Sequence, residues 1–96
     1  MIRFITRVPV KSDCVKEYFA GVKPYIEKTR KELGCIEYTV YWNEETKIAT
    51  YFEAFVDDGA CEVHVASEHF KAYFAAIAEK MQSGPMYGER FDNPLV

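Results

Sequence analysis

The sequence contains no apolar run approaching the ~20 residues of a membrane-spanning helix, so no transmembrane segment is expected. Glycine and proline are scarce, at five and four residues, which excludes collagen-like and low-complexity fibres. A glycine-rich phosphate-binding loop and a Cys-x-x-Cys unit are both absent. Basic residues are not in excess, because 12 Lys and Arg stand against 15 Asp and Glu. The net charge of −3 therefore argues against a nucleic-acid-binding protein.

The three cysteines, Cys14, Cys35 and Cys61, are odd in number and far apart in the sequence. Disulfide-stabilised secreted domains usually carry an even number of cysteines, whereas reduced thiols are typical of the cytoplasm. Residues 1–7 alternate charged and apolar side chains, unlike the continuous apolar stretch of a signal peptide. We therefore expect a cytoplasmic protein with free thiols.

Aromatic residues, by contrast, are abundant: seven Phe, seven Tyr and one Trp make up 16% of the 96 residues. This content excludes a disordered chain. The length allows a single domain, residues 1–96, and a domain of this size buries only about 60–65% of its unfolded surface. Either the aromatic side chains line a pocket, or a partner covers part of the surface.

The hydrophobic pattern predicts the element order β-α-β-β-α-β. Strands are expected where apolar and β-branched residues recur at period two, over residues 2–10, 35–43, 47–56 and 86–91. A first helix is expected to be capped by Ser12 or Asp13 and to end at Gly34, in the left-handed position after a helix. A second helical region, with a short and a longer segment, follows residues 57–59. The fold class is therefore α+β and ferredoxin-like, with both helices on one face of an antiparallel sheet.

The expected first helix has one continuous apolar stripe. Helical spacing places on it Val15, Phe19, Val22, Ile26 and Leu33. Tyr18, Tyr25 and Thr29 lie beside this stripe, which we expect to face the sheet.

Apolar side chains occur on both faces of the expected strand 47–56. Because side chains alternate along a strand, Phe52, Ala54 and Val56 point to one face and Tyr51 and Phe55 to the other. A sheet with helices on one face normally leaves its other face polar. We therefore expect a second copy of the chain to cover that face in a two-fold symmetric homodimer. A monomer with exposed aromatic residues is the alternative.

Glu53 lies in the middle of this strand, on the face of Tyr51 and Phe55. A carboxylate among aromatic rings is desolvated, which raises its pKa and suits it to proton transfer. Arg3 and Arg7 alternate along the first strand. If they share the face of Glu53, one of them pairs with it and keeps it ionised instead. A catalytic carboxylate and a structural ion pair both remain open on the sequence alone.

The two histidines, His64 and His69, lie five positions apart, which is ~140° of rotation on a helix. Two residues of one helix that bind the same metal ion are usually four positions apart, so no metal site is expected. His64 points inward, and His69 begins a helix, where a neutral imidazole is favoured. Each alone is typical of a buried, hydrogen-bonded histidine. Together with Glu53 and Tyr51, however, they indicate acid–base chemistry.

Two stretches resemble the antibiotic biosynthesis monooxygenase (ABM) family. Residues 29–38, Thr-Arg-Lys-Glu-Leu-Gly-Cys-Ile-Glu-Tyr, are similar to its R-x-E-x-G-C-x-x-Y segment. Residues 51–55, followed by Ala60, His64, Ser67, His69 and Phe70, are similar to its E-x-W…A…H…S-x-H-F segment. With the element order, the resemblance covers nearly the whole chain. It implies a dimeric α+β barrel, with a pocket between the sheet and the helices of each subunit.

Members of this family differ in activity. Some are cofactor-free monooxygenases of quinols and aromatic polyketides, in which the electron-rich substrate itself activates oxygen. Haem-degrading members carry a first-strand Asn and a Trp at the position of Phe55, so this chain departs from them. A third branch isomerises the phosphorylated autoinducer-2 signal. Residues 51–70 and 83–85 are similar to that branch, but Tyr25-Ile26 stands where it has an Asn-His pair.

The resemblance thus implies a cofactor-free, metal-free enzyme that acts, with molecular oxygen, on a small quinol or aromatic polyketide-like substrate. His69 or His64 would transfer a proton and Glu53 would assist. The residues expected to bind the substrate are Tyr51, Phe55, Tyr73 and Arg7. Two alternatives stay open: an isomerase of a small phosphorylated hydroxyketone, and a non-catalytic small-molecule-binding protein.

Overall fold

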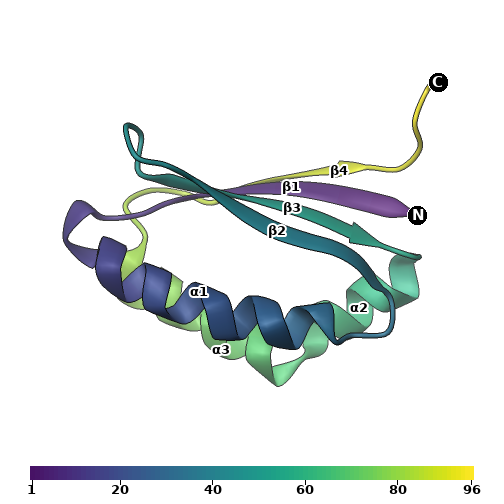
Figure 1. Cartoon of the computed structure of the whole chain (residues 1–96), viewed down its shortest axis with the longest axis horizontal. Helices are drawn as coiled ribbons and strands as arrows, with labels where there is room; N and C mark the ends of the chain where they lie inside the picture. Colours follow the sequence, from purple (N-terminus) through teal and green to yellow (C-terminus); the bar gives the residue numbers. More distant parts are fainter.

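The computed structural model describes residues 1–96. Four strands, β1 (Ile2–Pro9), β2 (Cys35–Asn43), β3 (Ile48–Phe55) and β4 (Tyr87–Phe91), form one antiparallel sheet in the order β2-β3-β1-β4. The helices α1 (Val15–Arg30), α2 (Asp58–Ala66) and α3 (Glu68–Ala76) all lie on one face of the sheet (Figure 1). This confirms the predicted ferredoxin-like order with β1 and β3 at the centre.

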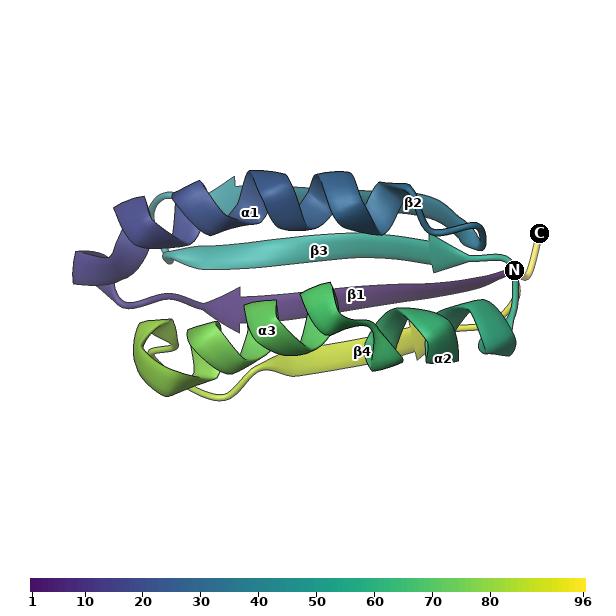
Figure 2. The same ribbon diagram turned by 90° about the horizontal axis from the view of Figure 1, so that it is seen from below.

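Seen from the helical side, α1 runs over the half of the sheet formed by β2 and β3, and α2 and α3 run over the half formed by β1 and β4 (Figure 2). A 3-10 turn (Ser12–Cys14, η1) precedes α1, and a π-helical turn (Ile77–Met81, η2) follows α3. None of the helices is both long and apolar enough to cross a membrane.

The helix starts differ in how they are capped. Asp57 accepts a hydrogen bond from the Ala60 amide at the start of α2, and Ser67 accepts one from the Phe70 amide at the start of α3. The expected side-chain cap of α1 is wrong. Ser12 and Asp13 form the preceding 3-10 turn, and no side chain caps this helix.

The extended backbone of Ser67, with ψ of 150°, separates α2 from α3. The two segments predicted for the second helical region are thus two separate helices. For this reason the ~140° rotation expected between His64 and His69 on a continuous helix does not apply.

Gly34 has an ordinary backbone conformation, so its expected left-handed position is wrong. The glycine is required for a steric reason instead. A Cβ atom at Gly34 would overlap the Cβ of Ala60 in α2. The turn after α1 thus packs directly against α2, which brings residues 31–34 close to both histidines.

The buried face of α1 is rotated from the predicted one. Tyr18, Tyr25 and Thr29 are buried, whereas Phe19 is 47% exposed and Leu33 is fully exposed. The tyrosines can be buried because their hydroxyl groups bond to other buried groups. Phe and Leu are more hydrophobic than Tyr, so hydrophobicity alone predicts the wrong buried face for α1.

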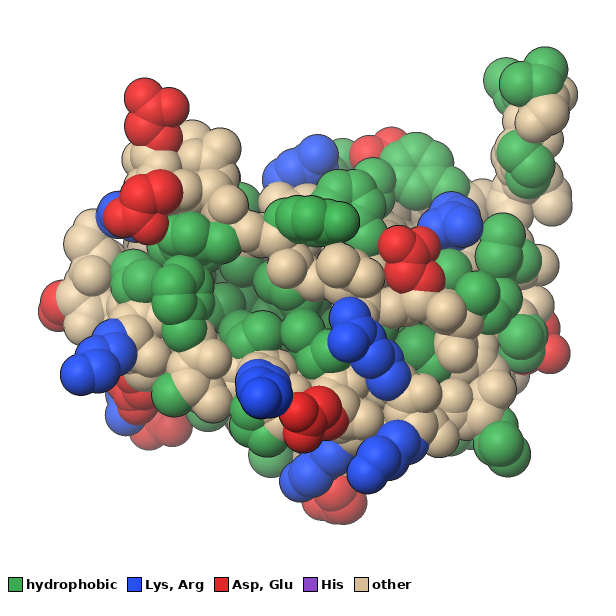
Figure 3. Space-filling model, in the orientation of Figure 1, with side chains coloured by type: hydrophobic (Ala, Val, Ile, Leu, Met, Phe, Trp, Pro, Cys, Tyr) green, Lys and Arg blue, Asp and Glu red, His purple; other side chains and the backbone are tan.

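A band of apolar side chains stays visible between β2 and α1, with charged side chains along the outer side of the helix (Figure 3). Phe19 lies at this band, packed edge-on against Trp42 with 5.0 Å between ring centroids. On the sheet face away from the helices, Tyr41 packs edge-on against Phe52 at 5.4 Å. Aromatic residues therefore occupy both faces of the sheet, as predicted.

Candidate functional site

A cavity of about 390 Å³ lies between the inner face of the sheet and the α2–α3 pair. Its apolar walls are formed by Phe4, Val65, Phe70, Phe74, Ala78 and Met86. Its polar groups come from β1, β2, β3 and α2, and are Thr6, Tyr38, Glu53, Cys61 and His64. Burial raises the pKa of the Cys61 thiol, so this group is not a ready nucleophile. The cavity thus combines an apolar, partly aromatic wall with five polar side chains.

A carboxylate from outside the cavity lining holds both histidines. Glu32, in the turn after α1, lies 3.0 Å from Nδ1 of His64 and 2.6 Å from Nε2 of His69 through the same oxygen, Oε2. The side chains of His64, Glu32 and His69 are 1%, 12% and 19% exposed. Glu32 is not among the site residues expected from the sequence. The one sequence feature that could have indicated a role for Glu32 is its place in the R-x-E-x-G-C-x-x-Y motif, two residues before Gly34.

The partners of His64 fix where its proton lies. Because the Glu32 carboxylate only accepts hydrogen bonds, Nδ1 of His64 carries the hydrogen, and Nε2 is left as an acceptor. Burial lowers the pKa of His64, although its bond to Glu32 acts in the opposite direction. The imidazole is therefore neutral at neutral pH, with its basic nitrogen turned away from Glu32.

Two tyrosines extend this arrangement to the cavity. The hydroxyl of Tyr25 lies 3.3 Å from Nε2 of His64 and donates to it. Tyr38, which lines the cavity, lies 2.7 Å from the Tyr25 hydroxyl and donates to it in turn. The result is a directed chain, Tyr38 to Tyr25 to His64 to Glu32, which we call the proton relay. It joins the cavity wall to a carboxylate near the surface.

Glu53 is a second acid–base group in the cavity. Its side chain accepts a hydrogen bond from the Thr6 hydroxyl at 3.0 Å. Burial raises the pKa of Glu53 to about 7, although the bond from Thr6 lowers it. This raised pKa agrees with the prediction for a carboxyl group among aromatic rings.

Neither arginine of β1 reaches Glu53. The register places Arg3 opposite Ala54 and Arg7 opposite Thr50, so both point to the outer face of the sheet. Arg3 pairs there with Glu37 at 2.6 Å. The structural ion pair considered for Glu53 is therefore absent, and Arg7 lies on the opposite side of the sheet from the cavity.

A family model described as antibiotic biosynthesis monooxygenase matches residues 1–76. The chain belongs to this family. The match ends at the last residue of α3, so β4 lies beyond the matched part. The resemblance found in the sequence is thereby confirmed.

Three relatives illustrate the similarity. The chain is 31% identical, over 69% of its length, to an uncharacterized protein, sll1783, of Synechocystis, and it spans about half (46%) of that protein. It is 33% identical to a conserved protein of Methanosarcina mazei, with a TM-score of 0.89 and 97% and 92% of the two chains covered. A crystal structure described as an antibiotic biosynthesis monooxygenase shares 22% identity, with a TM-score of 0.91 and 98% and 99% coverage, and shows the fold alone.

In this ABM-family chain, the expected substrate-binding aromatics lie behind the cavity rather than on its wall. Tyr51 and Phe55 are both fully buried. Phe55 packs against the His64 ring, with 5.0 Å between centroids. Tyr73 bonds to Tyr51 at 2.7 Å and stacks on Tyr25 at 3.9 Å. These residues hold the proton relay in place, while Phe70 and Phe74 line the cavity.

The buried tyrosines remain protonated donors. Burial raises the pKa of Tyr18, Tyr25, Tyr38, Tyr51 and Tyr73 above that of an ordinary phenol. Tyr51 joins Tyr18 and Tyr73 in one hydrogen-bonded group, and Tyr25 joins Tyr38 in another. A tyrosine of the relay can therefore pass a proton on but does not hold a stable negative charge.

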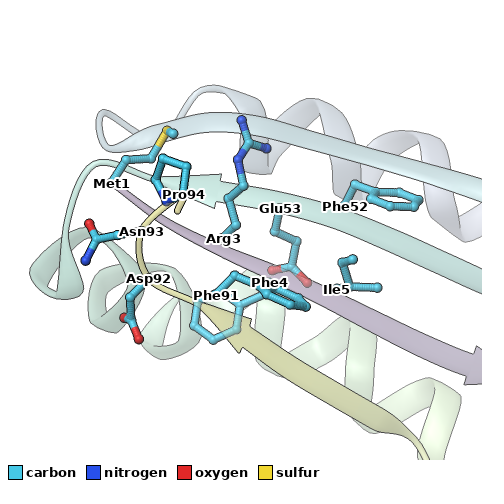
Figure 4. A pocket seen from close by; sticks show the side chains of 10 residues that line it. All are labelled: Met1, Arg3, Phe4, Ile5, Phe52, Glu53, Phe91, Asp92, Asn93 and Pro94. Carbon is cyan, nitrogen blue, oxygen red and sulfur yellow. The ribbon is translucent and has the colours of Figure 1, made fainter. Parts of the chain in front are cut away.

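A second hollow, of about 530 Å³, lies on the outer face of the ABM sheet (Figure 4). It is bounded by Arg3, Phe52, Phe91 and the chain end at 92–94, among others. Phe4 and Glu53 belong to the linings of both this hollow and the inner cavity. The two spaces therefore adjoin at these two residues.

Proposed function

We propose that the chain is a cofactor-independent monooxygenase-type enzyme that acts on a small quinol or aromatic polyketide-like substrate. The observation that carries this proposal is the neutral His64, held by Glu32 and connected through two phenols to an aromatic cavity. In such an enzyme the protein needs to supply a base, because the substrate anion is itself reactive toward oxygen.

The relay provides this base by transferring a proton from the cavity to His64. The substrate hydroxyl or acidic C–H gives its proton to the Tyr38 oxygen as the Tyr38 proton moves to Tyr25 and the Tyr25 proton moves to Nε2 of His64. The imidazolium that forms is stabilised by Glu32, as a carboxylate stabilises histidine in a catalytic triad. For a substrate CH₂ group, addition of O₂ to the anion and loss of water leaves a carbonyl group.

Glu53 serves as a second proton-transfer group of the same cavity. With a pKa of about 7, a large fraction of this carboxyl is protonated at neutral pH, so it can donate to an oxygen that becomes negative during the reaction. His69 has a supporting part, because it shares the Glu32 oxygen with His64 and lies outside the cavity wall.

The cavity favours a neutral, flat substrate over a phosphorylated one. Its volume lies in the range of roughly 300–1,000 Å³ common for small-molecule sites, and rings form much of its wall. Neither Lys nor Arg lines it, so a phosphate group would lie beside Glu53 without a counter-charge. The isomerase of a phosphorylated hydroxyketone is therefore the less supported alternative.

Oxygen uptake tests this function. Purified protein without added metal or flavin is mixed with a panel of reduced quinones and anthrones, and uptake is measured with an oxygen electrode. We expect Glu32→Gln and His64→Gln to lower turnover by about 10²–10⁴-fold, as loss of a general base does, and the exposed Glu62→Gln to leave it unchanged. Binding of these compounds without uptake would instead support the non-catalytic alternative, and neither binding nor uptake would refute both.

We further infer that a second copy of the chain covers the outer face of the sheet. Tyr41, 62% exposed, packs there against Phe52, and Phe91, 42% exposed, lines the outer hollow. Light scattering should then give twice the chain mass, and Tyr41→Lys should lower it to that of one chain. We place this homodimer in the cytoplasm, since all three cysteines are free thiols.

A further inference from the structure

We propose that Glu32, His64 and His69 form a binding site for a divalent transition-metal ion, with Zn²⁺ the best match. One donor atom from each side chain lies within 4.8 Å of the other two. The three residues come from the turn after α1, the last turn of α2 and the first turn of α3. The helix break at Ser67 is what brings the imidazoles together.

The donor set suits a transition metal. Two imidazoles and one carboxylate bind Zn²⁺ in several enzymes and Fe²⁺ in others, whereas Mg²⁺ and Ca²⁺ prefer oxygen ligands alone. With three ligands from the protein, a fourth position remains for water. His69, at 19% exposure, and Glu32, at 12%, open the site to solvent, so an ion can enter without unfolding the core.

The two distances from Glu32 require only a small adjustment, and the two imidazole nitrogens lie within 4.8 Å of each other. Donor atoms on one tetrahedral Zn²⁺ lie about 3.3 Å apart, given metal–ligand distances of about 2.0–2.2 Å. The Glu32 oxygen now lies 3.0 Å from the His64 nitrogen and 2.6 Å from the His69 nitrogen. Glu32 is in a turn rather than a helix or strand, so its side chain can move outward by this amount.

The surroundings of His64 can accommodate the metal-bound form. An ion on Nδ1 moves the imidazole hydrogen to Nε2, which then donates to the Tyr25 oxygen. The Tyr25 hydroxyl must turn to another acceptor. Thr29 Oγ1 is buried, has no hydrogen-bond partner, and lies one helical turn after Tyr25 in α1. This otherwise unexplained orphan oxygen is the acceptor that the reversed Tyr25 hydroxyl needs.

Metal binding and the proton relay require different forms of the His64 imidazole. The relay needs the hydrogen on Nδ1, whereas an ion on Nδ1 places the hydrogen on Nε2. With an ion on Nδ1, Nε2 of His64 carries a hydrogen and no longer accepts one from Tyr25. We therefore expect Zn²⁺ to inhibit the proposed oxidation of the substrate by molecular oxygen. The site itself does not depend on that reaction, because metal binding is measured without any substrate.

Calorimetric titration of the chelator-treated protein with Zn²⁺ tests the site, with Co²⁺ absorption as a second probe. We expect one ion per chain and a Co²⁺ spectrum without thiolate charge transfer. Glu32→Gln and His69→Ala should weaken Zn²⁺ binding by about 100-fold or more, and Tyr25→Phe by about tenfold. Glu62→Gln and Cys61→Ser are the matched controls and should bind as the parent protein does.

Three results would overturn the site: no Zn²⁺ binding by the parent protein, unchanged affinity in both ligand variants, or loss of binding in Cys61→Ser. Circular dichroism of each variant establishes that it is folded. If a ligand variant does not fold, the Co²⁺ spectrum of the parent protein still decides between imidazole and thiolate ligands. Failure of oxygen uptake with every quinol would remove the proposed function and leave this site standing.

Discussion

Glu53→Gln should change the pH dependence of folding in a way that can be calculated. In the folded protein, burial raises the pKa of Glu53 from an ordinary 4.5 to about 7. Each pH unit between these values is worth about 1.4 kcal/mol, so ionised Glu53 costs the folded state about 3 kcal/mol. Glutamine has the same shape and can still accept the Thr6 hydrogen bond, but it has no charge to bury.

The sign follows from which state holds the proton more tightly. Below about pH 4.5, Glu53 is protonated in both the folded and the unfolded chain, and the stability difference between variant and parent does not vary with pH. Between pH 4.5 and about 7 the unfolded chain has lost this proton while the folded one keeps it, so the parent loses stability as the pH rises. Above about pH 7 the variant should be the more stable by about 3 kcal/mol, relative to their difference in acid.

Urea unfolding, followed by Trp42 fluorescence at fixed protein concentration, measures this difference. Between about pH 4 and pH 8.5 the urea concentration at the unfolding midpoint should rise by about 2 M for the variant relative to the parent. Comparing two proteins at each pH cancels the titration of His64, whose pKa is lowered in the folded state and acts in the opposite direction. Glu62→Gln, at an exposed site, should show no such trend. A difference between Glu53→Gln and parent that is the same at every pH would refute the reasoning.

Gly34→Ala should destabilise the protein by about 2 kcal/mol or more because its new Cβ overlaps Ala60, and Gly34→Ala with Ala60→Gly should recover most of the loss in thermal unfolding. Thr29→Val should raise the free energy of unfolding by about 1 kcal/mol, because it removes a buried hydroxyl without a partner; a loss of stability in urea unfolding would contradict this. Tyr25→Phe should interrupt the relay and lower oxygen uptake by about 10²-fold, and unchanged uptake would show that Tyr25 carries no proton.

The strands and their order followed from local pattern. Period-two alternation over residues 35–43 predicted β2 within its observed bounds, and the strand predicted over 47–56 differs from β3 by one residue at each end. Turn residues and alternation are properties of neighbouring positions, so a single sequence contains them. The fold class, and the position of Glu53 on the same face of β3 as Tyr51 and Phe55, could therefore be predicted.

The site depended on contacts that a local pattern does not contain. Glu32 reaches the histidines only because the turn at Gly34 packs on α2, more than 25 residues along the chain. His64 and His69 meet only because Ser67 has an extended backbone, so the ~140° that their spacing gives on a continuous helix does not describe them. Arg7 was included as a candidate although the face of β1 it occupies is set by pairing with β3. In each case the deciding partner is distant in sequence.

Phe4 and Glu53 line both the inner cavity and the outer hollow, so the two spaces adjoin at these residues. Water that enters the outer hollow of a single chain can hydrate this carboxyl from behind. A second copy closing over the sheet would expel that water and raise the pKa of Glu53 further. The acid strength of one group in the cavity would then vary with protein concentration, and activity per chain would have a pH optimum that shifts on dilution.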